Sequence, residues 1–288
     1  MSTPPFVTLP EGVAVERWPV SGTERAVMRT ELAADAAWML LVPGFTGSKE
    51  DFIAVLPLLA DRGIGGVTYD QFGQFESDGS ADPADYTIER LAVDLRVLVE
   101  VARARFALTA APTLVGHSFG GLVAQRAVVD GLDVAEFVAL CTGPGALPPH
   151  RHGGLNDLVE ALPHTDLEVI WNIMQAQAEQ AEKVGQVPGD PQVRDFLRRR
   201  WLANHPVQIR EFGHQLMTAP PVTGRMRARL ADGLPARVMW GEHDDAWPID
   251  LQAQMAADWG VPGIALPDVG HSPNAERPVE LVAALLGR

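Results

Sequence analysis

Hydrophobic and polar positions change their pattern along this chain. Residues 13–18 and 25–30 alternate between polar and apolar, as half-buried antiparallel strands do, and Ser21-Gly22-Thr23 between them favours a turn. Later apolar runs are short and uninterrupted, which is typical of strands buried on both faces. These runs are residues 38–42, 66–69, 113–115, 135–141, 237–240 and 263–266.

Segments with apolar residues at helical spacing separate these runs. They cover residues 51–62, 87–104, 119–129, 249–259 and 274–286. Strands that alternate with helices predict a mostly parallel, doubly wound sheet with helices on both faces. The fold class is therefore α/β.

The alternation stops between residues 145 and 230, where the pattern is helical throughout. Breaks are expected at Pro163, Pro188, Pro206 and Pro220-Pro221. We interpret residues 1–144 and 231–288 as two parts of one α/β core, and residues 145–230 as an inserted helical lid. Such a lid is expected over the carboxyl ends of the strands, where open α/β sheets bind ligands.

The stretch Gly116-His117-Ser118-Phe119-Gly120 joins a predicted strand to a predicted helix. Gly-x-Ser-x-Gly in this context is typical of a nucleophile elbow, in which a sharp turn lifts the serine hydroxyl clear of the sheet. Glycines on either side remove side chains that would collide, and the helix start points free N–H groups at the same spot. The pattern predicts that Ser118 is a nucleophile.

A serine nucleophile needs a base, and the base needs an acid that orients it. Two later stretches follow predicted strands directly. One is Gly241-Glu242-His243-Asp244-Asp245, and the other is Asp268-Val269-Gly270-His271-Ser272-Pro273. Because the carboxyl ends of parallel strands share one edge, both stretches are expected near Ser118.

These motifs make the chain resemble the α/β-hydrolase superfamily over nearly its whole length. The resemblance rests on Gly-His-Ser-Phe-Gly-Gly, Gly-Glu-His-Asp and Gly-His-Ser-Pro. It implies an α/β-hydrolase fold with Ser118 as nucleophile, Asp244 as acid and His271 as base, in that chain order. Asp245 is the competing acid. The other reading makes Asp244 a turn former and His271 a solvated loop residue, but chain order and position speak against it.

The resemblance also implies an oxyanion hole with backbone N–H donors at Phe119 and Phe45. Where the superfamily commonly has His-Gly, this chain has Pro43-Gly44, which need not matter because the backbone donates. Thr46 either adds a hydroxyl to the site or is a simple turn residue.

A second departure concerns residues 70–77. Many relatives carry Asp-x-Arg-Gly-x-Gly-x-Ser there, whereas this chain has Phe72 in place of the arginine and Phe75 in place of the second glycine. The change is either altered loop packing or a ring directed into the substrate pocket. The candidate pocket residues are Thr46, Phe75, Cys141, Trp171 and Trp201. For Cys141 and the two tryptophans the alternative is packing, within the core and between lid helices. His117 is expected to be a packed neighbour rather than a second base.

Net charge and composition limit the kinds of molecule that this protein is expected to bind. The 288 residues carry a net charge of −14, which disfavours nucleic acid and anionic membranes and promotes solubility. With a single cysteine, an absent signal-peptide pattern and no apolar run of membrane-spanning length, we expect a cytoplasmic protein without membrane insertion. His150, His152 and His164 lack a metal-binding spacing, so no metal and no cofactor are expected. The oligomeric state is left open.

The function expected from these features is hydrolysis of a carboxylic ester or lactone through an acyl-enzyme. Aromatic and aliphatic residues near the site favour an uncharged, medium-sized apolar substrate. Three alternatives stay open, since a fold does not fix a function. They are a lyase, cyclase or C–C bond hydrolase with the same triad, a cofactor-free perhydrolase or haloperoxidase-like enzyme, and a ligand-binding protein without catalysis.

Overall fold

An eight-stranded sheet forms the centre of the computed structural model, which describes residues 2–182 and 190–287. The strand order is β1-β2-β4-β3-β5-β6-β7-β8. The strands are β1 (Ala14–Val20), β2 (Thr23–Arg29), β3 (Trp38–Val42), β4 (Gly65–Tyr69), β5 (Thr113–His117), β6 (Glu136–Leu140), β7 (Ala236–Gly241) and β8 (Gly263–Leu266).

The sheet is mostly parallel, as the sequence predicts. β1 and β2 form an antiparallel hairpin at one edge, and β2 runs antiparallel to β4. All remaining neighbours are parallel. Ser21 and Gly22 close the hairpin with φ of 50° and 84°, the left-handed conformations that match the twist of a two-residue turn.

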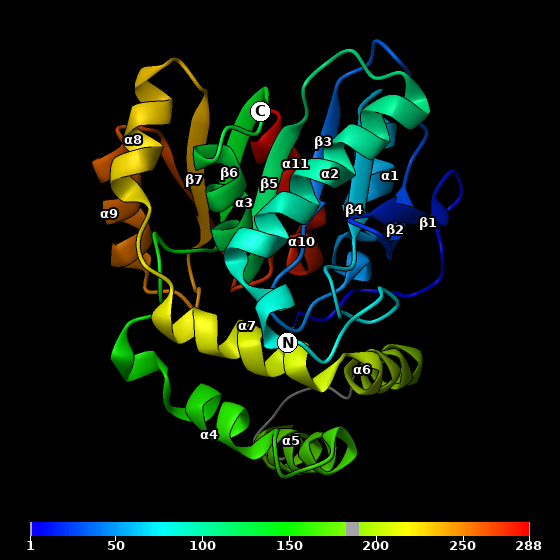
Figure 1. Cartoon of the computed structure of the whole chain (residues 1–288), viewed down its shortest axis with the longest axis vertical. Helices are drawn as coiled ribbons and strands as arrows, with labels where there is room; N and C mark the ends of the chain where they lie inside the picture. Colours follow the sequence, from blue (N-terminus) through cyan, green and yellow to red (C-terminus); the bar gives the residue numbers. More distant parts are fainter. Residues whose placement is uncertain (1, 183–189, 288) are drawn as a thin grey trace.

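Helices cover both faces of the sheet (Figure 1). One face packs against α2 (Ile88–Phe106), α3 (Phe119–Val129), α8 (Thr223–Ala231) and α9 (Ile249–Trp259). The other face packs against α1 (Val55–Ala60) and α11 (Pro278–Leu285), with the short α10 (Pro273–Glu276) beside α11. Each face has its own apolar core, so the sheet is a doubly wound layer.

Four helices form a separate layer below the sheet in Figure 1, across the carboxyl ends of the strands. This helical layer consists of α4 (Gly153–Ala161), α5 (Leu167–Glu182), α6 (Pro191–Ala203) and α7 (Pro206–Thr218). Pro163 separates α4 from α5, Pro206 starts α7, and Pro220-Pro221 separates α7 from α8, whereas Pro188 lies outside the described residues. α8 lies against α3 and α9. That the layer acts as a lid stays a prediction.

Two predicted helices are interrupted. Residues 51–62 divide into a 3₁₀ helix, η1 (Lys49–Phe52), and α1, because Pro57 has no N–H for the carbonyl of Ile53. Residues 274–286 divide into α10 and α11 at Arg277. The proline that follows at 278 disfavours helical geometry for this arginine.

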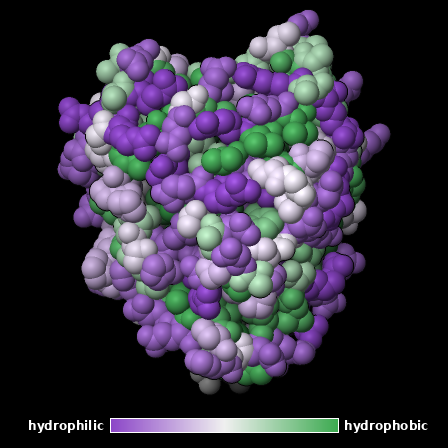
Figure 2. All heavy atoms as spheres, viewed as in Figure 1, coloured by the Kyte–Doolittle hydropathy of each residue, from purple (hydrophilic) through white to green (hydrophobic). Residues whose placement is uncertain are grey.

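Hydrophilic residues cover most of the face seen in Figure 2, with hydrophobic ones interspersed. Within residues 2–182 and 190–287, we find no helix whose length and apolar character would let it cross a bilayer.

Candidate active site

Ser118 occupies the sharp turn between β5 and α3. Its backbone has φ 54° and ψ −123°, a strained conformation for a residue with a side chain. A Cβ atom at position 120 would lie 2.4 Å from the carbonyl oxygen of Pro43, and one at position 116 would lie 2.7 Å from the Cα of Gly121. The two flanking glycines therefore let the turn approach its neighbours closely, in the manner of a nucleophile elbow.

His271 and Asp244 meet beyond the ends of β8 and β7. The Nδ1 atom of His271 lies 2.8 Å from Oδ1 of Asp244. The buried carboxylate also accepts hydrogen bonds from the backbone N–H groups of Ala246 and Trp247 and from the side-chain amide of Gln252. Burial raises the pKa of Asp244, but His271 and the other donors outweigh it and hold this pKa below its ordinary value. The ionised acid orients His271 with a proton on Nδ1, which leaves Nε2 free to accept one.

Asp245 lies in a different environment from its neighbour. Its side chain is exposed, and its backbone carbonyl accepts a hydrogen bond of 2.7 Å from Arg151. Of these two aspartates, Asp244 is the one whose carboxylate contacts the imidazole.

Ser118 and His271 line one cavity of about 640 Å³. Its apolar wall includes Phe45, Leu155, Leu216 and Trp247, and its polar wall includes Arg151, His243 and Asp245. The cavity is thus lined by loops after β3, β5, β7 and β8 and by helices of the layer. No hydrogen bond joins the Ser118 hydroxyl to His271 among the described residues, and such contacts often shorten only around a substrate.

The loop after β3 is held by buried glutamines that the sequence analysis does not identify. The Gln74 amide donates to the carbonyls of Gly44 and Phe45, at 2.8 and 3.1 Å, and the Gln71 amide donates to that of Pro43 at 2.9 Å. With these carbonyls bound on one side, the orientation of the Phe45 peptide is fixed. Both glutamines belong to residues 70–77, where the sequence analysis compares only Phe72 and Phe75 with relatives, and no periodic pattern marks the glutamines as buried.

His117 packs beside His271, as expected for a neighbour rather than a base. Its Nε2 atom lies 2.8 Å from the carbonyl oxygen of His271, and its Nδ1 atom is buried without a partner. Burial and the nearby His271 lower the pKa of His117 to about 3. The ring is therefore neutral near pH 7, and the Nε2–H group donates to the loop that carries His271.

Of the five predicted pocket residues, only Thr46 lines this cavity. Trp171 and Trp201 are buried in the apolar cluster of the helical layer, because helices α5 and α6 must bury their own apolar faces. Cys141 is fully buried in the core beneath α1 and α11. The ring of Phe75 lies edge-on to Phe196 of α6, at 5.6 Å between centroids. The structure does not place these four on the cavity wall.

Potential metal ligands also come together here. Donor atoms of His117, Cys141 and His271 lie within 4.8 Å of one another. Burial raises the pKa of the Cys141 thiol, and the negative charge of Asp244 raises it further. Because a thiol must lose its proton to ligate a metal, this environment works against metal binding.

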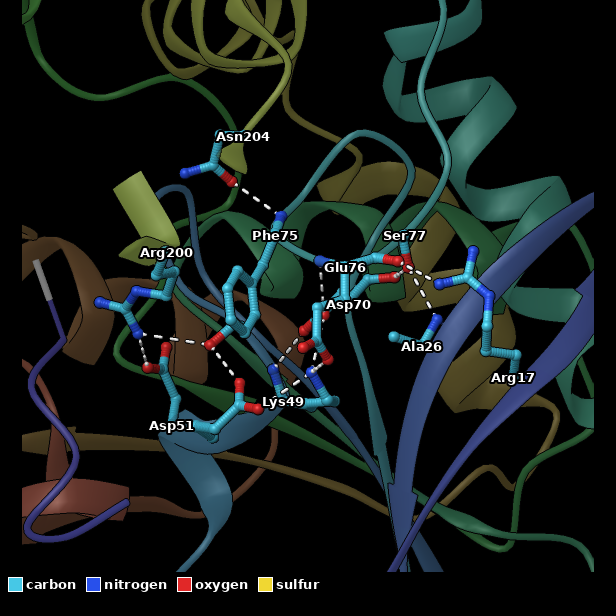
Figure 3. A network of polar contacts seen from close by, with 12 residues as sticks. Arg17, Ala26, Lys49, Asp51, Asp70, Phe75, Glu76, Ser77, Arg200 and Asn204 are labelled. Atoms are coloured by element: carbon cyan, nitrogen blue, oxygen red, sulfur yellow. Dashed lines mark hydrogen bonds and ion pairs between the residues drawn. The ribbon is translucent and has the colours of Figure 1, made fainter. Parts of the chain in front are cut away.

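A second polar network ties the helical layer to the core (Figure 3). Arg200 of α6 donates to Asp51 of η1 at 2.7 Å, and both side chains are almost completely buried. The same guanidinium donates to the backbone carbonyl of Ser2 at 2.6 Å. Burial raises the pKa of Asp51, although Arg200 counteracts it. One arginine thus joins the layer, the core and the start of the described chain.

Lys49 continues this network into the core. Its buried ammonium group contacts the carboxylates of Glu50, Asp70 and Glu76 at 2.9, 3.0 and 2.6 Å. It also lies 4.7 Å from the ring centroid of Phe75, a cation–π contact. Phe75 has a φ of 38°, a left-handed conformation that explains why glycine suits this position in relatives.

Comparison with known proteins places the fold. A family model described as the alpha/beta hydrolase family matches residues 39–285. Proline iminopeptidase of Saccharolobus solfataricus is 29% identical over 125 residues, a match that covers 43% of this chain and only 39% of that protein. The enol-lactonase of Burkholderia xenovorans LB400 has a TM-score of 0.75 at 18% identity, covering 94% of this chain and 98% of its own. A thermophilic esterase of Thermogutta terrifontis has a TM-score of 0.72 at 21% identity, covering 95% and 97%.

Proposed function

Because the chain belongs to the alpha/beta hydrolase family, we propose that it is a serine hydrolase that cleaves a carboxylic ester or lactone. One observation carries this proposal. The Asp244–His271 pair and the strained Ser118 turn open onto a single cavity. The arrangement fits a nucleophile, a base and an orienting acid in the chain order of the family.

In the proposed reaction, the Ser118 hydroxyl attacks the carbonyl carbon of the substrate and its proton passes to Nε2 of His271. Asp244 stabilises the imidazolium that results, through the hydrogen bond to Nδ1. The tetrahedral intermediate collapses, and the leaving alkoxide takes the proton from His271. A water molecule then attacks the acyl-enzyme with the same base, which releases the acid and regenerates Ser118.

Backbone donors would stabilise the negative oxygen of the intermediate. We assign this role to the N–H groups of Phe119, at the start of α3, and of Phe45, in the loop that Gln71 and Gln74 hold. A donor that is already in place costs no reorganisation during the reaction, and loss of one such donor typically costs about 10²–10³-fold in kcat.

The bond type is the least constrained part of the proposal. One relative is a proline iminopeptidase, a name that indicates amide cleavage. The structural neighbours include an enol-lactonase and an esterase, names that indicate oxygen esters. The cavity wall is part apolar and part charged. A panel of acyl esters from acetyl to decanoyl, with lactones and proline anilide, measures the preference. A best rate on the anilide would move the assignment to peptide bonds.

The nucleophile is tested by replacing Ser118→Ala. We expect a fluorophosphonate probe to label the unaltered protein on Ser118 and not the variant. Ester turnover should fall by several orders of magnitude, since the residual rate would come only from binding and the oxyanion donors. Circular dichroism and thermal melting check that the variant is folded. Undiminished ester hydrolysis by the variant would refute the proposal.

A further inference from the structure

The carboxylate of Glu276 spans the loop that carries His271. Its Oε2 atom accepts a hydrogen bond of 2.6 Å from the N–H of Gly270, and its Oε1 atom accepts one of 2.8 Å from the N–H of Ser272. These two residues stand immediately before and after His271. The carboxylate therefore binds the backbone N–H groups of the residues on both sides of His271.

The close approach depends on glycine at position 270. A Cβ atom there would lie 3.1 Å from each oxygen of the Glu276 carboxylate, closer than most real contacts. On the opposite side, His117 donates to the carbonyl oxygen of His271. The peptide groups around His271 are thus held by Glu276 and His117, and its ring is held by Asp244.

A simpler role for Glu276 would be to cap the short helix α10. Ser272 is the N-cap residue of that helix, and in a capping box a glutamate at the third helical position reaches back to the N–H of the N-cap residue. Glu276 is at the fourth position, one residue further along. A cap of this kind occupies one carboxylate oxygen. Here the second oxygen bonds Gly270, which lies outside the helix and across His271 from the cap. Capping therefore accounts for only half of the contact.

We propose that Glu276 is a positioning residue for the reaction, acting through the backbone of the His271 loop. This inference rests on the proposed function, because it assumes that His271 is the base for Ser118. The carboxylate supplies acceptors for two N–H groups, and hydrogen bonds to a carboxylate are stronger than those between neutral groups. With the loop fixed, the imidazole of His271 keeps its place on the wall of the cavity that Ser118 also lines.

The test compares three variants of Glu276 with a matched control. Glu276→Gln keeps the size of the side chain, but its NH₂ group can only donate. One of the two backbone N–H groups therefore loses its acceptor. Glu276→Ala removes both acceptors, and Glu276→Asp keeps both on a shorter stem. The control is Glu280→Gln, which removes the same charge from an exposed glutamate of α11 whose carboxylate lies 3.9 Å from Arg277.

We expect kcat to fall by up to about 10²-fold in Glu276→Gln and Glu276→Ala, the effect of a small misplacement of a reacting group. Glu276 also lines the cavity, but both of its carboxylate oxygens are bound by the loop backbone, so kcat should change more than KM. Glu276→Asp should retain more activity than Glu276→Gln, and Glu280→Gln should match the unaltered protein. Thermal melting checks that every variant is folded.

A spectroscopic readout separates positioning from general stability. In the unaltered protein, the Hδ1 proton of His271 is expected as a low-field resonance because Asp244 accepts it. This signal should broaden or disappear in Glu276→Gln and persist in Glu280→Gln. Unchanged kcat in Glu276→Gln would overturn the inference, as would lost kcat with an unchanged resonance. Failure of the proposed function is distinguishable, since it would appear as retained activity in Ser118→Ala.

Discussion

Asp244 in the candidate active site and Asp70 at the base of the helical layer are both buried aspartates with several donors, yet their pKa values move in opposite directions. Asp244 accepts four hydrogen bonds, including one from His271, and its pKa lies below the ordinary value. Asp70 accepts from the backbone and ammonium of Lys49 and from the N–H of Glu76. Burial nevertheless raises the pKa of Asp70 to about 7, with Lys49 opposing and Glu50 adding to the rise.

The difference shows that one nearby cation does not by itself lower the pKa of a buried carboxylate. Asp70 has a lysine at 3.0 Å but shares it with Glu50 and Glu76, whose negative charges oppose its own. Asp244 has His271 as its partner, which alternates between neutral and cationic in the proposed reaction. Its other contacts are uncharged N–H donors. Neutral donors that are already in place stabilise a carboxylate without competing anions. Such an environment suits an acid that must stay ionised while its partner gains and loses a proton.

The largest expected effect is the loss of turnover on replacing Asp244, the aspartate of the candidate active site. Asp244→Asn should lower turnover by up to about 10⁴-fold, because the amide can present a donor to Nδ1 and favour the wrong tautomer of His271. Asp245→Asn is the matched control, since its side chain is exposed, and it should change turnover little. Steady-state kinetics on one ester measures both. The reverse ranking would transfer the acid role to Asp245.

The helical layer, in contrast, is joined to the core by a buried ion pair. Arg200→Ala removes the cation from Asp51 and leaves that carboxylate buried, which typically costs about 3–5 kcal/mol in the free energy of unfolding. Arg198→Ala, on the same helix, breaks an ion pair with Glu168 in which both side chains are about half exposed. That change should cost about 1 kcal/mol or less. Urea unfolding at one pH compares the two, and equal losses would contradict a special role for the buried pair.

The smallest effect is a pH dependence at Asp70. Its pKa is higher in the folded protein than in the unfolded chain, so the folded state binds more protons between about pH 4 and 7. Stability from this group is therefore lost as pH rises through that window. Asp70→Asn cannot ionise and should escape the loss, so its melting temperature relative to the unaltered protein should rise from pH 5 to pH 8. The exposed Asp133→Asn is the control. A constant difference across this range would contradict the raised pKa.

The parts of the molecule that follow from local pattern could be predicted from the sequence. Ser118, Asp244 and His271 follow the ends of β5, β7 and β8 within a few residues, and parallel topology brings them to one edge of the sheet. The short apolar run of β8 predicts its position correctly but not its burial, because β8 is an edge strand and three of its four residues are at least partly exposed. The strand that carries each of them appears where the hydrophobic pattern places it. That these residues perform catalysis stays a prediction, whereas their proximity follows from the fold.

Features that depend on partners far along the chain could not be predicted. Gln71 and Gln74 look like ordinary loop residues until their amides meet the carbonyls of Pro43 and Gly44. The aromatic residues Trp171 and Trp201 satisfy a helical pattern, but the pattern does not tell whether their apolar face meets a substrate or another helix. The structure shows the second.

Phe75 couples the stability of the loop of residues 70–77 to that of helix α6. Its left-handed backbone costs about 1–2 kcal/mol, and the contacts of its ring with Lys49 and Phe196 offset this cost. The N–H of Phe75 is also bound by the side chain of Asn204, just beyond α6. If α6 detaches, the loop of residues 70–77 keeps its strain, retains the contact with Lys49, and loses those with Phe196 and Asn204. We therefore expect helix α6 and this loop to open as one cooperative unit, so that their amide protons exchange with solvent together.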